Sequence, residues 1–543
     1  KDERVARLFA VCYSARPSRP HNRTMSLSHC SEVVVGGGWS GVYWAWRRLD
    51  QPGYDASGLC LLEASGRLGG RTYSVPDLAL GGHNFTLDVG AYRFSPDMHL
   101  PGDVILKLAL PTACYEPGCP SAKKDMPKPF QFNYSAPLRR IIDPATGLPA
   151  GYATALEAMA REIAAAGATV TLGAELVAIE PRGGAADGAA AGAPALRIKS
   201  AAGGATRTER IEPAIVMLNV PRARLLPLPG VASLLGGRVK SALSCIRFDS
   251  PKGAGWKNFS RFHSGNDTTA LSKAYLGYES AWWRSPAVNL TEGEYPQNAF
   301  FPIATSKGVP IGVRWSDGPV RCAARGAAGG AARECAGFLE VFYSVSNETL
   351  FRSVSRAPVD PLGVATRATA GGRARLDLVH WALLEAISPL LTARGVKAAS
   401  LPKPSLLAVG VWTRPDAKEP LGPPVGYTAP TKVYYAPEVS GSLGEACGVS
   451  GLTEGEYRLA ALQPLGPGAP LYMANNDWVV SETRYMYGDW AEESLLQAER
   501  ALRVAGQPRP AWLDADYYEQ RVASVLRADR RAAGLELTGL AAA

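Results

Sequence analysis

The distribution of apolar residues along the chain predicts buried strands that alternate with amphipathic helices. The segments EVVV at 32–35 and GLCLLEA at 58–64 are short and mainly apolar, as in strands buried on both faces, and GVYWAWRRL between them has helical spacing. Further along, the pattern predicts a helix and two strands within 151–180 and an apolar strand within 211–221. It also predicts a helix over 490–506 that stops at Gly506. This alternation indicates an α/β or mixed α+β fold and excludes an all-β one.

The turn VVVGGGWSG joins the first strand to its helix. Gly36, Gly38 and Gly41 fill the pattern G-x-G-x-x-G, which permits a tight turn, close approach of a pyrophosphate and close packing of helix on strand. The free N–H groups of the helix N-terminus favour an anion there. The second strand ends in Glu63, an acid suited to a ribose diol. The sequence therefore predicts a dinucleotide site, with a glycine-rich turn that binds nothing as the alternative.

A second glycine motif follows directly. The stretch ASGRLGGRTYS places Arg67, Gly69, Gly70 and Arg71 after Glu63, which suits a second pass of backbone along phosphates and is not needed in an NAD domain. With this motif the sequence resembles the flavin-containing amine oxidase family, whose signature is an acid followed by x3-R-x-G-G-R. The resemblance implies non-covalent FAD, in a Rossmann-like FAD-binding domain of the glutathione-reductase/amine-oxidase type with an interleaved substrate-binding domain.

The resemblance runs over most of the chain from about residue 31 to about residue 507. It implies an FAD-binding domain made of three parts, 31–95, 151–225 and 406–507. The substrate domain has two parts, 96–150 and 226–405, and residues 508–543 form a C-terminal helical extension. The positions that it assigns to FAD are Gly36, Gly38, Gly41, Glu63, Ala64, Arg67, Gly70, Arg71, Gly90, Val177, Trp412, Asn476 and Trp490. Within this set, Val177 in AELVAIE lies on the adenine side and Trp412 in VGVWTRPD packs beside the flavin.

Two basic residues are implied on the substrate side. Arg93, in LDVGAYRF, stands where the L-amino acid oxidase subgroup has an arginine for the substrate carboxylate, and a guanidinium fork matches a carboxylate bidentately. A surface loop arginine is the alternative. Lys273, in LSKAYLGYESAWW, stands where the family has a lysine that binds water near flavin N5. A lysine in an apolar strand is costly unless it serves a site, and a snorkelling lysine on an edge strand is the alternative.

The remaining candidates concern the pocket wall. The stretch GPPVGYTAP has no cysteine for covalent attachment of flavin, and its Tyr427 is either a cage aromatic or a turn tyrosine. The C-terminal block YMANNDWVVSETRYMYGDWAEESLL departs from the family: Asn476 replaces a Glu, and Asp489 replaces a Gly before Trp490. Asn476 can still accept from a ribityl hydroxyl, and Trp490 suits the aromatic wall. Asp489 either holds a cationic amine or blocks the pocket.

The resemblance implies a FAD-dependent oxidase that converts amines, L-amino acids foremost, with molecular oxygen to 2-oxo acid, ammonia and hydrogen peroxide. A primary amine or polyamine oxidase is the first alternative, and a flavin desaturase or isomerase on an apolar substrate is another. A structural or binding glycoprotein with a decayed site on the same fold is the alternative of another class. The oligomeric state stays open.

Composition bounds the partners and the compartment. The net charge of +9 is spread thinly, which argues against a nucleic-acid partner, and no apolar run has the length for a membrane span. Without a CxxC pair no metal site is expected. Seven of the eleven asparagines begin N-x-[ST] sequons, which predicts N-linked glycans and a secreted or cell-surface location. The sequons begin at Asn22, Asn84, Asn133, Asn258, Asn266, Asn289 and Asn347.

Nine cysteines are consistent with a secretory pathway. Cys114 and Cys119 could close a short loop around a Pro-Gly turn, and Cys322 and Cys335 bracket an Ala/Gly-rich loop that a disulfide would stabilise. Cys60 lies in a predicted buried strand, so we expect a free thiol in the core.

Overall fold

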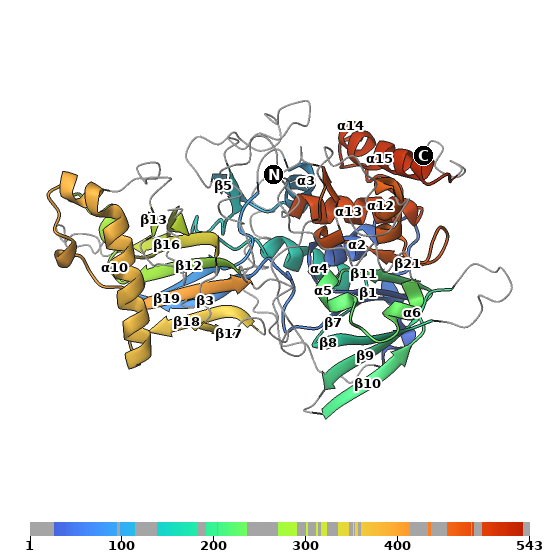
Figure 1. Cartoon of the computed structure of the whole chain (residues 1–543), viewed down its shortest axis with the longest axis horizontal. Coiled ribbons are helices and arrows are strands. Elements are labelled where there is room, and N and C mark those ends of the chain that lie inside the picture. Colours follow the sequence, from blue (N-terminus) through green and yellow to red (C-terminus); the bar gives the residue numbers. More distant parts are fainter. Residues whose placement is uncertain are drawn as a thin grey trace, which may run out of the picture.

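The computed structural model describes residues 26–94, 98–114, 138–181, 192–202, 205–235, 270–289, 300–301, 311–312, 316–322, 335–346, 351, 353–356, 360–412, 433–435, 453–478, 480–482 and 491–535. Figure 1 shows a parallel sheet with its helices on one side of the view and a larger antiparallel sheet on the other.

A five-stranded parallel sheet forms the first half. Its strand order is β21–β11–β1–β2–β7, with bounds Leu471–Met473, Ile215–Leu218, Glu32–Val35, Leu59–Glu63 and Thr169–Leu172. Alternate residues face opposite sides: Val34 and Leu61 join the core under the helices, whereas Val33 and Leu62 join the core on the other face. Burial on both faces explains the nearly continuous apolar strands that the sequence shows. The predicted strands at 32–35 and 58–64 are confirmed.

Helices cover one face of this sheet and a small sheet covers the other. The helices are α2 (Trp39–Arg48), α3 (His99–Lys107), α4 (Thr154–Ala165) and α13 (Ala491–Val504), all of which contribute to one apolar core. The small antiparallel sheet has the order β10–β9–β8, with bounds Ala205–Ile211, Ala195–Ala202 and Ala174–Glu180. The helix and strands predicted within 151–180 are confirmed as α4, β7 and β8, and the helix predicted before Gly506 is confirmed as α13.

A six-stranded antiparallel sheet forms the second half. Its order is β15–β16–β12–β19–β18–β17, with bounds Ser316–Cys322, Cys335–Ser346, Ala270–Tyr278, Leu406–Trp412, Asp360–Thr366 and Ser355–Arg356. Helix α10 (Ala370–Ala393) packs on one face through an apolar core with residues such as Leu276 and Val409. The hairpin β3 (Ser74–Leu80) and β4 (His83–Asp88) packs on the other face, where Tyr275 and Ala408 lie.

The other described elements are short. They are β5 (Thr112–Cys114) with β6 (Arg139–Ile141), β13 (Phe300–Phe301) with β14 (Ile311–Gly312), β20 (Val433–Tyr435) with β22 (Val480–Glu482), α5 (Arg222–Leu225), α6 (Val231–Leu235), α12 (Glu454–Leu462), α14 (Ala515–Tyr518), the π-helix η7 (Glu519–Ala523), α15 (Ser524–Ala532) and the 3₁₀ turns η1 (Leu27–His29), η2 (Ala56–Gly58), η4 (Trp282–Arg284), η5 (Ala398–Ser400) and η6 (Asn476–Trp478). The stretch after residue 507 is therefore helical over much of its described length.

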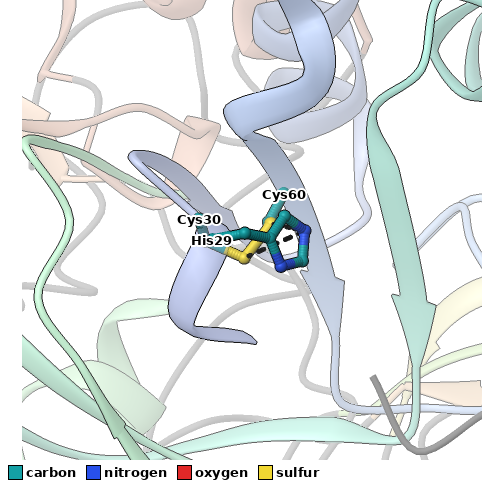
Figure 2. Close-up of side chains that lie close together, drawn as sticks. All are labelled: His29, Cys30 and Cys60. Atoms are coloured by element: carbon teal, nitrogen blue, oxygen red, sulfur yellow. Dashed lines mark hydrogen bonds between the residues drawn. A yellow bond between two sulfur atoms is a disulfide. The ribbon is translucent and has the colours of Figure 1, made fainter. Parts of the chain in front are cut away.

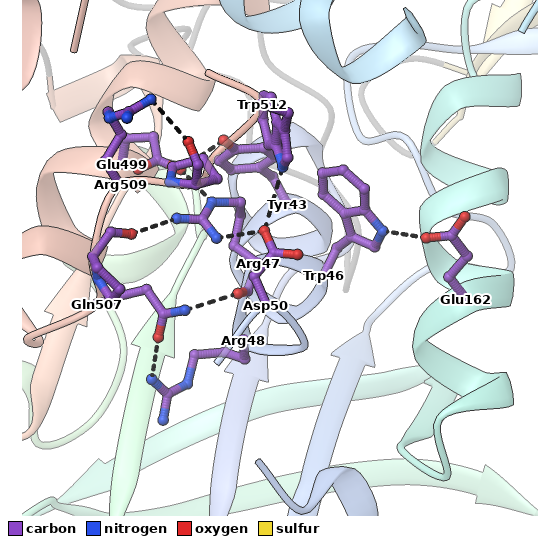
Figure 3. Close-up of polar contacts among 12 residues, drawn as sticks. Tyr43, Trp46, Arg47, Arg48, Asp50, Glu162, Glu499, Gln507, Arg509 and Trp512 are labelled. Atoms are coloured by element: carbon purple, nitrogen blue, oxygen red, sulfur yellow. Dashed lines mark hydrogen bonds and ion pairs between the residues drawn. The ribbon is translucent and has the colours of Figure 1, made fainter. Parts of the chain in front are cut away.

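A buried charge cluster ties α2 to α13 and to the chain that follows α13 (Figure 3). The fully buried Arg47 donates from Nε to Glu499 at 2.6 Å, from Nη1 to Asp50 at 2.7 Å and from Nη2 to the Pro508 carbonyl at 2.9 Å. Tyr43 donates to the same Glu499 carboxylate at 2.6 Å. The helix that begins at the glycine turn is thus fixed by contacts to residues more than 450 positions away.

Two predicted cysteine assignments meet different outcomes. The disulfide between Cys322 and Cys335 is confirmed and joins paired residues of β15 and β16. The expectation of a free Cys60 is wrong, because Cys60 forms a disulfide with Cys30, with 5.6 Å between the two Cα atoms. The turn η1 brings Cys30 beside the start of β2, which local sequence does not reveal. Cys114 is also disulfide-bonded, and its predicted partner Cys119 lies outside the described residues.

Helix α10 is one departure from the expected absence of long apolar runs. Among the described residues it is long and apolar enough, by length and composition only, to cross a membrane, with a mean hydropathy of 1.3. Its buried side chains, among them Leu376, Leu383 and Ile387, pack on the six-stranded sheet. We therefore interpret α10 as the covering helix of that sheet.

Candidate functional site

The glycine turn between β1 and α2 is held so tightly that side chains are excluded. Gly36 has a φ of +102°, and a Cβ there would lie 2.3 Å from the Asn219 carbonyl oxygen. A Cβ on Gly41 would lie 2.0 Å from the Gly36 carbonyl oxygen. The helix can approach the strand this closely only with glycine at these positions.

The start of α2 is suited to an anion. Its N-cap is Gly38, which has no side chain to satisfy the first N–H groups of the helix. Glu63, at the end of the neighbouring strand, accepts from the backbone N–H of Gly37 at 2.6 Å and of Ser65 at 2.8 Å. The carboxylate therefore stands beside the turn with further acceptor capacity, as a ribose-binding acid requires.

The second glycine motif lies directly on the first. The Gly69 N–H donates to the Gly37 carbonyl at 2.8 Å, and a Cβ on Gly70 would lie 3.3 Å from the Cα of Gly38. Gly69 and Gly70 both have positive φ, at 105° and 56°. Two glycine-rich backbone segments thus stack at one edge of the parallel sheet, where strand ends of an α/β fold bind ligands.

Arg67 stabilises this second turn from within. Its guanidinium donates to the carbonyls of Leu68, Gly70 and Thr72, at 3.1, 2.7 and 3.2 Å, and lies 3.7 Å from the ring centroid of Tyr73. Arg67, which the resemblance assigns to FAD, therefore positions the backbone of the second glycine turn.

Arg71 joins the second motif to the C-terminal block. It forms an ion pair with Asp477 at 2.5 Å and a hydrogen bond to the Oδ1 of Asn476. Asn475, beside them, donates to the Val220 carbonyl at 2.9 Å. Asn476 and Arg71, 405 residues apart, are thus brought together as the predicted site requires.

Two other positions that were predicted to bind FAD, Val177 and Ala64, are only partly buried. Val177 is partly exposed and lies at an irregularity of β8, where the pairing with β9 shifts between Leu176 and Ala178. Ala64 is partly buried and directly follows β2.

The chain that leaves β4 links the two halves of the molecule. Trp412 donates from Nε1 to the Val89 carbonyl at 3.0 Å, and a Cβ on Gly410 would lie 2.2 Å from that oxygen. A Cβ on Gly90 would lie 2.2 Å from the Arg71 carbonyl oxygen and 3.0 Å from the Trp412 ring. Glycine at 90 and 410 lets the segment pass between the second motif and the six-stranded sheet.

Lys273 reaches this segment from β12. Its Nζ donates to the carbonyls of Gly90 at 2.6 Å and Asp88 at 3.2 Å, and only 2% of the residue is exposed. Burial lowers the pKa of Lys273 to about 7; the carboxylates of Glu340 and Asp88 act in the opposite direction, and Arg93 reinforces the lowering. The expected alternative of a snorkelling lysine does not fit, because β12 is a central strand and the residue is buried.

One buried carboxyl group, Glu340, and one partly buried carboxyl group, Asp88, accompany Lys273. Tyr275, two residues along the same face of β12, donates to the Asp88 carbonyl at 3.0 Å and lies 3.4 Å from Glu340 Oε2. Burial raises the pKa of Asp88 to about 6, although its side chain accepts from Ser74 and from the Tyr152 N–H. The site therefore holds groups that exchange protons near neutral pH.

Arg93 lies close to Lys273. It is 7% exposed, and its Cζ is 4.6 Å from the ring centroid of Tyr92, while the Lys273 Nζ is 3.3 Å from the same centroid. The expected alternative of a surface arginine is therefore wrong. An aromatic ring with two nearby cations is a cation–π arrangement that accommodates positive charge in a buried place.

Most of the predicted site residues lie at the two glycine motifs or along the chain that leaves β4. Tyr427, Asp489 and Trp490 lie outside the described residues.

Sequence reasoning missed several residues at the site, namely Asn219, Asp88, Tyr92, Tyr275 and Glu340. Asn219 follows β11, and its N–H donates to the Val35 carbonyl at 2.8 Å. Because carboxyl ends of adjacent parallel strands share an edge, the strand predicted within 211–221 could have indicated it. Glu340 is opposite Tyr275 in the β12–β16 ladder, a register that no local pattern discloses.

Comparison with known proteins agrees with the dinucleotide prediction. No curated protein matches the sequence. A solved structure with a similar chain course is a double mutant of putrescine oxidase from a structure-based redesign of cofactor binding; it is 12% identical, with a TM-score of 0.42, covering 88% of this chain and 99% of that chain. Residues 34–100 match the NAD(P)-binding Rossmann-like domain, so this chain contains a Rossmann-like dinucleotide-binding unit within a mixed α/β fold.

Proposed function

We propose that this protein is a FAD-dependent oxidase of amines, with L-amino acids as the substrate class. The observation that carries the proposal is the convergence of three distant segments on the chain between Asp88 and Arg93. Lys273 from β12 and Trp412 from β19 both donate to its carbonyls, and Gly90 lies against the second glycine motif. A buried basic group thus stands beside the dinucleotide-binding edge of the parallel sheet.

The residues of this edge fit FAD. The close glycine backbone at Gly36 and Gly41, the uncapped start of α2 and the Glu63 carboxylate suit the adenosine and pyrophosphate part. The stacked second turn, with Arg71 joined to Asn476, extends this surface toward Gly90 and Trp412. FAD, when bound, supplies the acceptor for a hydride from the carbon that carries the amine.

The protein's own groups would bind and orient the substrate. Arg93 would pair with the substrate carboxylate, because a guanidinium fork binds a carboxylate bidentately. Lys273, with a pKa of about 7, would hold an ordered water at Nζ and exchange a proton there near neutral pH. Tyr92 and Trp412 would exclude bulk water from this part of the pocket.

A primary amine or polyamine is the second candidate substrate class. The buried Glu340 carboxylate supports it, because a carboxylate near the site favours a cationic substrate and a polyamine needs no carboxylate anchor. Arg93 discriminates the two classes: only an amino acid substrate depends on its charge.

The test is an absorption spectrum of the purified protein before and after anaerobic addition of L-amino acids, and then of primary amines and diamines. We expect a flavin band that bleaches with L-amino acids, and Arg93→Ala should weaken this response by about 10²-fold or more while a flavin band remains. Arg373→Ala, an exposed arginine on α10, is the matched control.

Each other result has a definite meaning. Bleaching by amines that survives Arg93→Ala would assign the amine or polyamine class. A flavin that no amine reduces would support a decayed binding protein or another flavin chemistry, and a colourless protein would refute the cofactor proposal.

We further propose that the protein is a secreted glycoprotein. Asn84 on β4 and Asn289 are exposed, as acceptors must be, and the other five sequons lie outside the described residues. Expression in a eukaryotic secretory host, followed by enzymatic removal of N-glycans, should lower the apparent mass. Asn84→Gln and Asn289→Gln should each remove part of that change; no change in mass on deglycosylation would refute the assignment.

A further inference from the structure

A second cluster of chemically active side chains lies at the opposite edge of the parallel sheet from the glycine turn. His29 ends η1, Cys30 follows it before β1, and Cys60 lies in β2 (Figure 2). The His29 Nε2 is 3.6 Å from the Cys60 Sγ and 4.0 Å from the Cys30 Sγ. The two sulfurs are buried in the core on the small-sheet side, whereas His29 is exposed and lies beside them.

The orientation of the His29 ring is set by a backbone carbonyl. Nδ1 lies 3.0 Å from the Ser26 carbonyl oxygen, which can only accept, so Nδ1 carries the proton. Nε2 then carries the lone pair, which accepts from the Thr169 hydroxyl at 3.0 Å in the oxidised state and becomes available to a metal when that hydroxyl turns away. A histidine held through Nδ1–H to a carbonyl, with Nε2 available, is the arrangement found in metal-binding histidines.

The spacing of these atoms matches a tetrahedral metal site. With Zn–S of about 2.3 Å and Zn–N of about 2.0 Å, tetrahedral angles place ligand nitrogen and sulfur about 3.6 Å apart. The observed nitrogen–sulfur distances are 3.6 and 4.0 Å, and all three ligand atoms lie within 4.8 Å of one another. Only the bonded sulfurs depart from this geometry, since they would have to separate to about 3.8 Å.

We propose that His29, Cys30 and Cys60 form a thiol-gated site for Zn²⁺ or a similar divalent metal. In the oxidised protein the disulfide closes the site. A dithiol reductant breaks the Cys30–Cys60 bond by giving two electrons and two protons, and itself becomes a disulfide. The two thiols then bind Zn²⁺ with loss of both protons, and His29 Nε2 is the third ligand. A water or the Thr169 hydroxyl completes the tetrahedron.

In either state the three residues tie η1 to the start of β1 and β2. Disulfide and metal are thus interchangeable links at one place in the fold. The pair of cysteines, 30 residues apart, has no CxxC spacing, which is why the sequence alone led to the expectation of no metal site.

The test compares the full-length protein, reduced and oxidised, with Co²⁺ and then Zn²⁺ as probes under anaerobic conditions. Reduced protein, obtained by production in a reducing cytosol, should bind one Co²⁺ per chain with sulfur-to-cobalt charge-transfer absorption, and Zn²⁺ should displace it. The oxidised protein of the same sequence should bind none. His29→Ala should weaken Zn²⁺ binding at least about tenfold while both thiols remain.

Controls separate this site from other thiols and from the proposed flavin site. The double variant Cys322→Ser, Cys335→Ser should bind Co²⁺ as strongly as the unchanged protein, whereas Cys60→Ser should not bind it. The comparison of oxidised and reduced protein and the His29→Ala variant keep both cysteines, so they decide the matter even if Cys60→Ser does not fold. Absence of Co²⁺ binding to reduced protein, or equal binding in His29→Ala, would overturn the proposal.

Discussion

Two buried cations, one in each half of the molecule, differ in how their charge is compensated. Arg47, on α2, is fully buried and meets the carboxylates of Glu499 and Asp50. Burial lowers the pKa of Arg47, but the Glu499 carboxylate, the Tyr43 hydroxyl and the Asp50 carboxylate together more than reverse this effect. Lys273, in the six-stranded sheet, donates to two backbone carbonyls, and burial lowers its pKa to about 7.

The difference separates scaffold from site. A buried charge with a direct ionic partner holds chain segments together and does not change its protonation. A buried lysine with a pKa near neutrality costs stability and is retained where its proton is useful. At these two positions, the dinucleotide half carries a fixed charge and the other half carries a group that can titrate.

The largest expected effect comes from removing the fixed charge. Arg47→Met leaves Glu499 buried without its cation, so we expect the free energy of unfolding to fall by about 3–5 kcal/mol. Urea denaturation measures this loss. Arg527→Met, in a largely exposed pair with Glu519, is the control and should change stability by about 0.5 kcal/mol or less.

A second variant sharpens this prediction. Combining Arg47→Met with Glu499→Leu should recover much of the loss, because no isolated charge then remains in the core. If Arg47→Met costs no more than Arg527→Met, the cluster in Figure 3 is not what holds α2, and the comparison fails.

The next effect concerns the backbone of the dinucleotide turn. Gly41→Ala places a Cβ 2.0 Å from the Gly36 carbonyl oxygen, so α2 must move away from β1. We expect a stability loss of about 1–3 kcal/mol and loss of bound flavin, measured from the absorption of the purified protein. Gly66→Ala, where a Cβ would have nothing within 4 Å, should retain both. Equal flavin content in the two variants would show that close helix–strand packing is not needed for binding.

The two halves also differ in how far the sequence predicts them. The β1–α2–β2 unit is predictable because its signals are local: apolar strands, a glycine turn and a terminal acid within about 30 residues. The cores of β12 and β19 could be recognised as strands, but their partners could not. Lys273 donates to the carbonyl of Gly90, which lies 183 residues away in the sequence. Neither the neighbours of Lys273 nor its pKa can be inferred from the sequence of its strand alone.

Cysteine pairing shows the same limit. The Cys322–Cys335 disulfide closes a loop visible in the sequence, whereas Cys30–Cys60 depends on how η1 sits against the parallel sheet. Arg93 was recognised only through a motif, and its burial beside Tyr92 requires the packed structure. Local chemistry is predictable, and contacts between distant segments are not.

The effect that is smallest over a single pH unit, and that tests the comparison most directly, is the pH dependence contributed by Lys273. The unfolded chain holds the Lys273 proton up to a pKa of about 10.4, and the folded chain only up to about 7. Between these values the unfolded state binds more protons, so this residue makes stability rise with pH, by at most about 1.4 kcal/mol per pH unit.

Lys273→Met removes this contribution. The variant should be the more stable of the two below about pH 10, because it neither buries a charge nor has to release a proton on folding. Its advantage should be largest and constant below about pH 7 and should shrink as the pH rises toward about 10. Denaturant unfolding at several pH values measures both curves. Lys199→Met, a partly exposed lysine on β9, should leave the pH dependence of the unchanged protein intact. Parallel curves for Lys273→Met and the unchanged protein would mean that Lys273 keeps its proton on folding, and the distinction between a fixed and a titrating buried cation would then be lost.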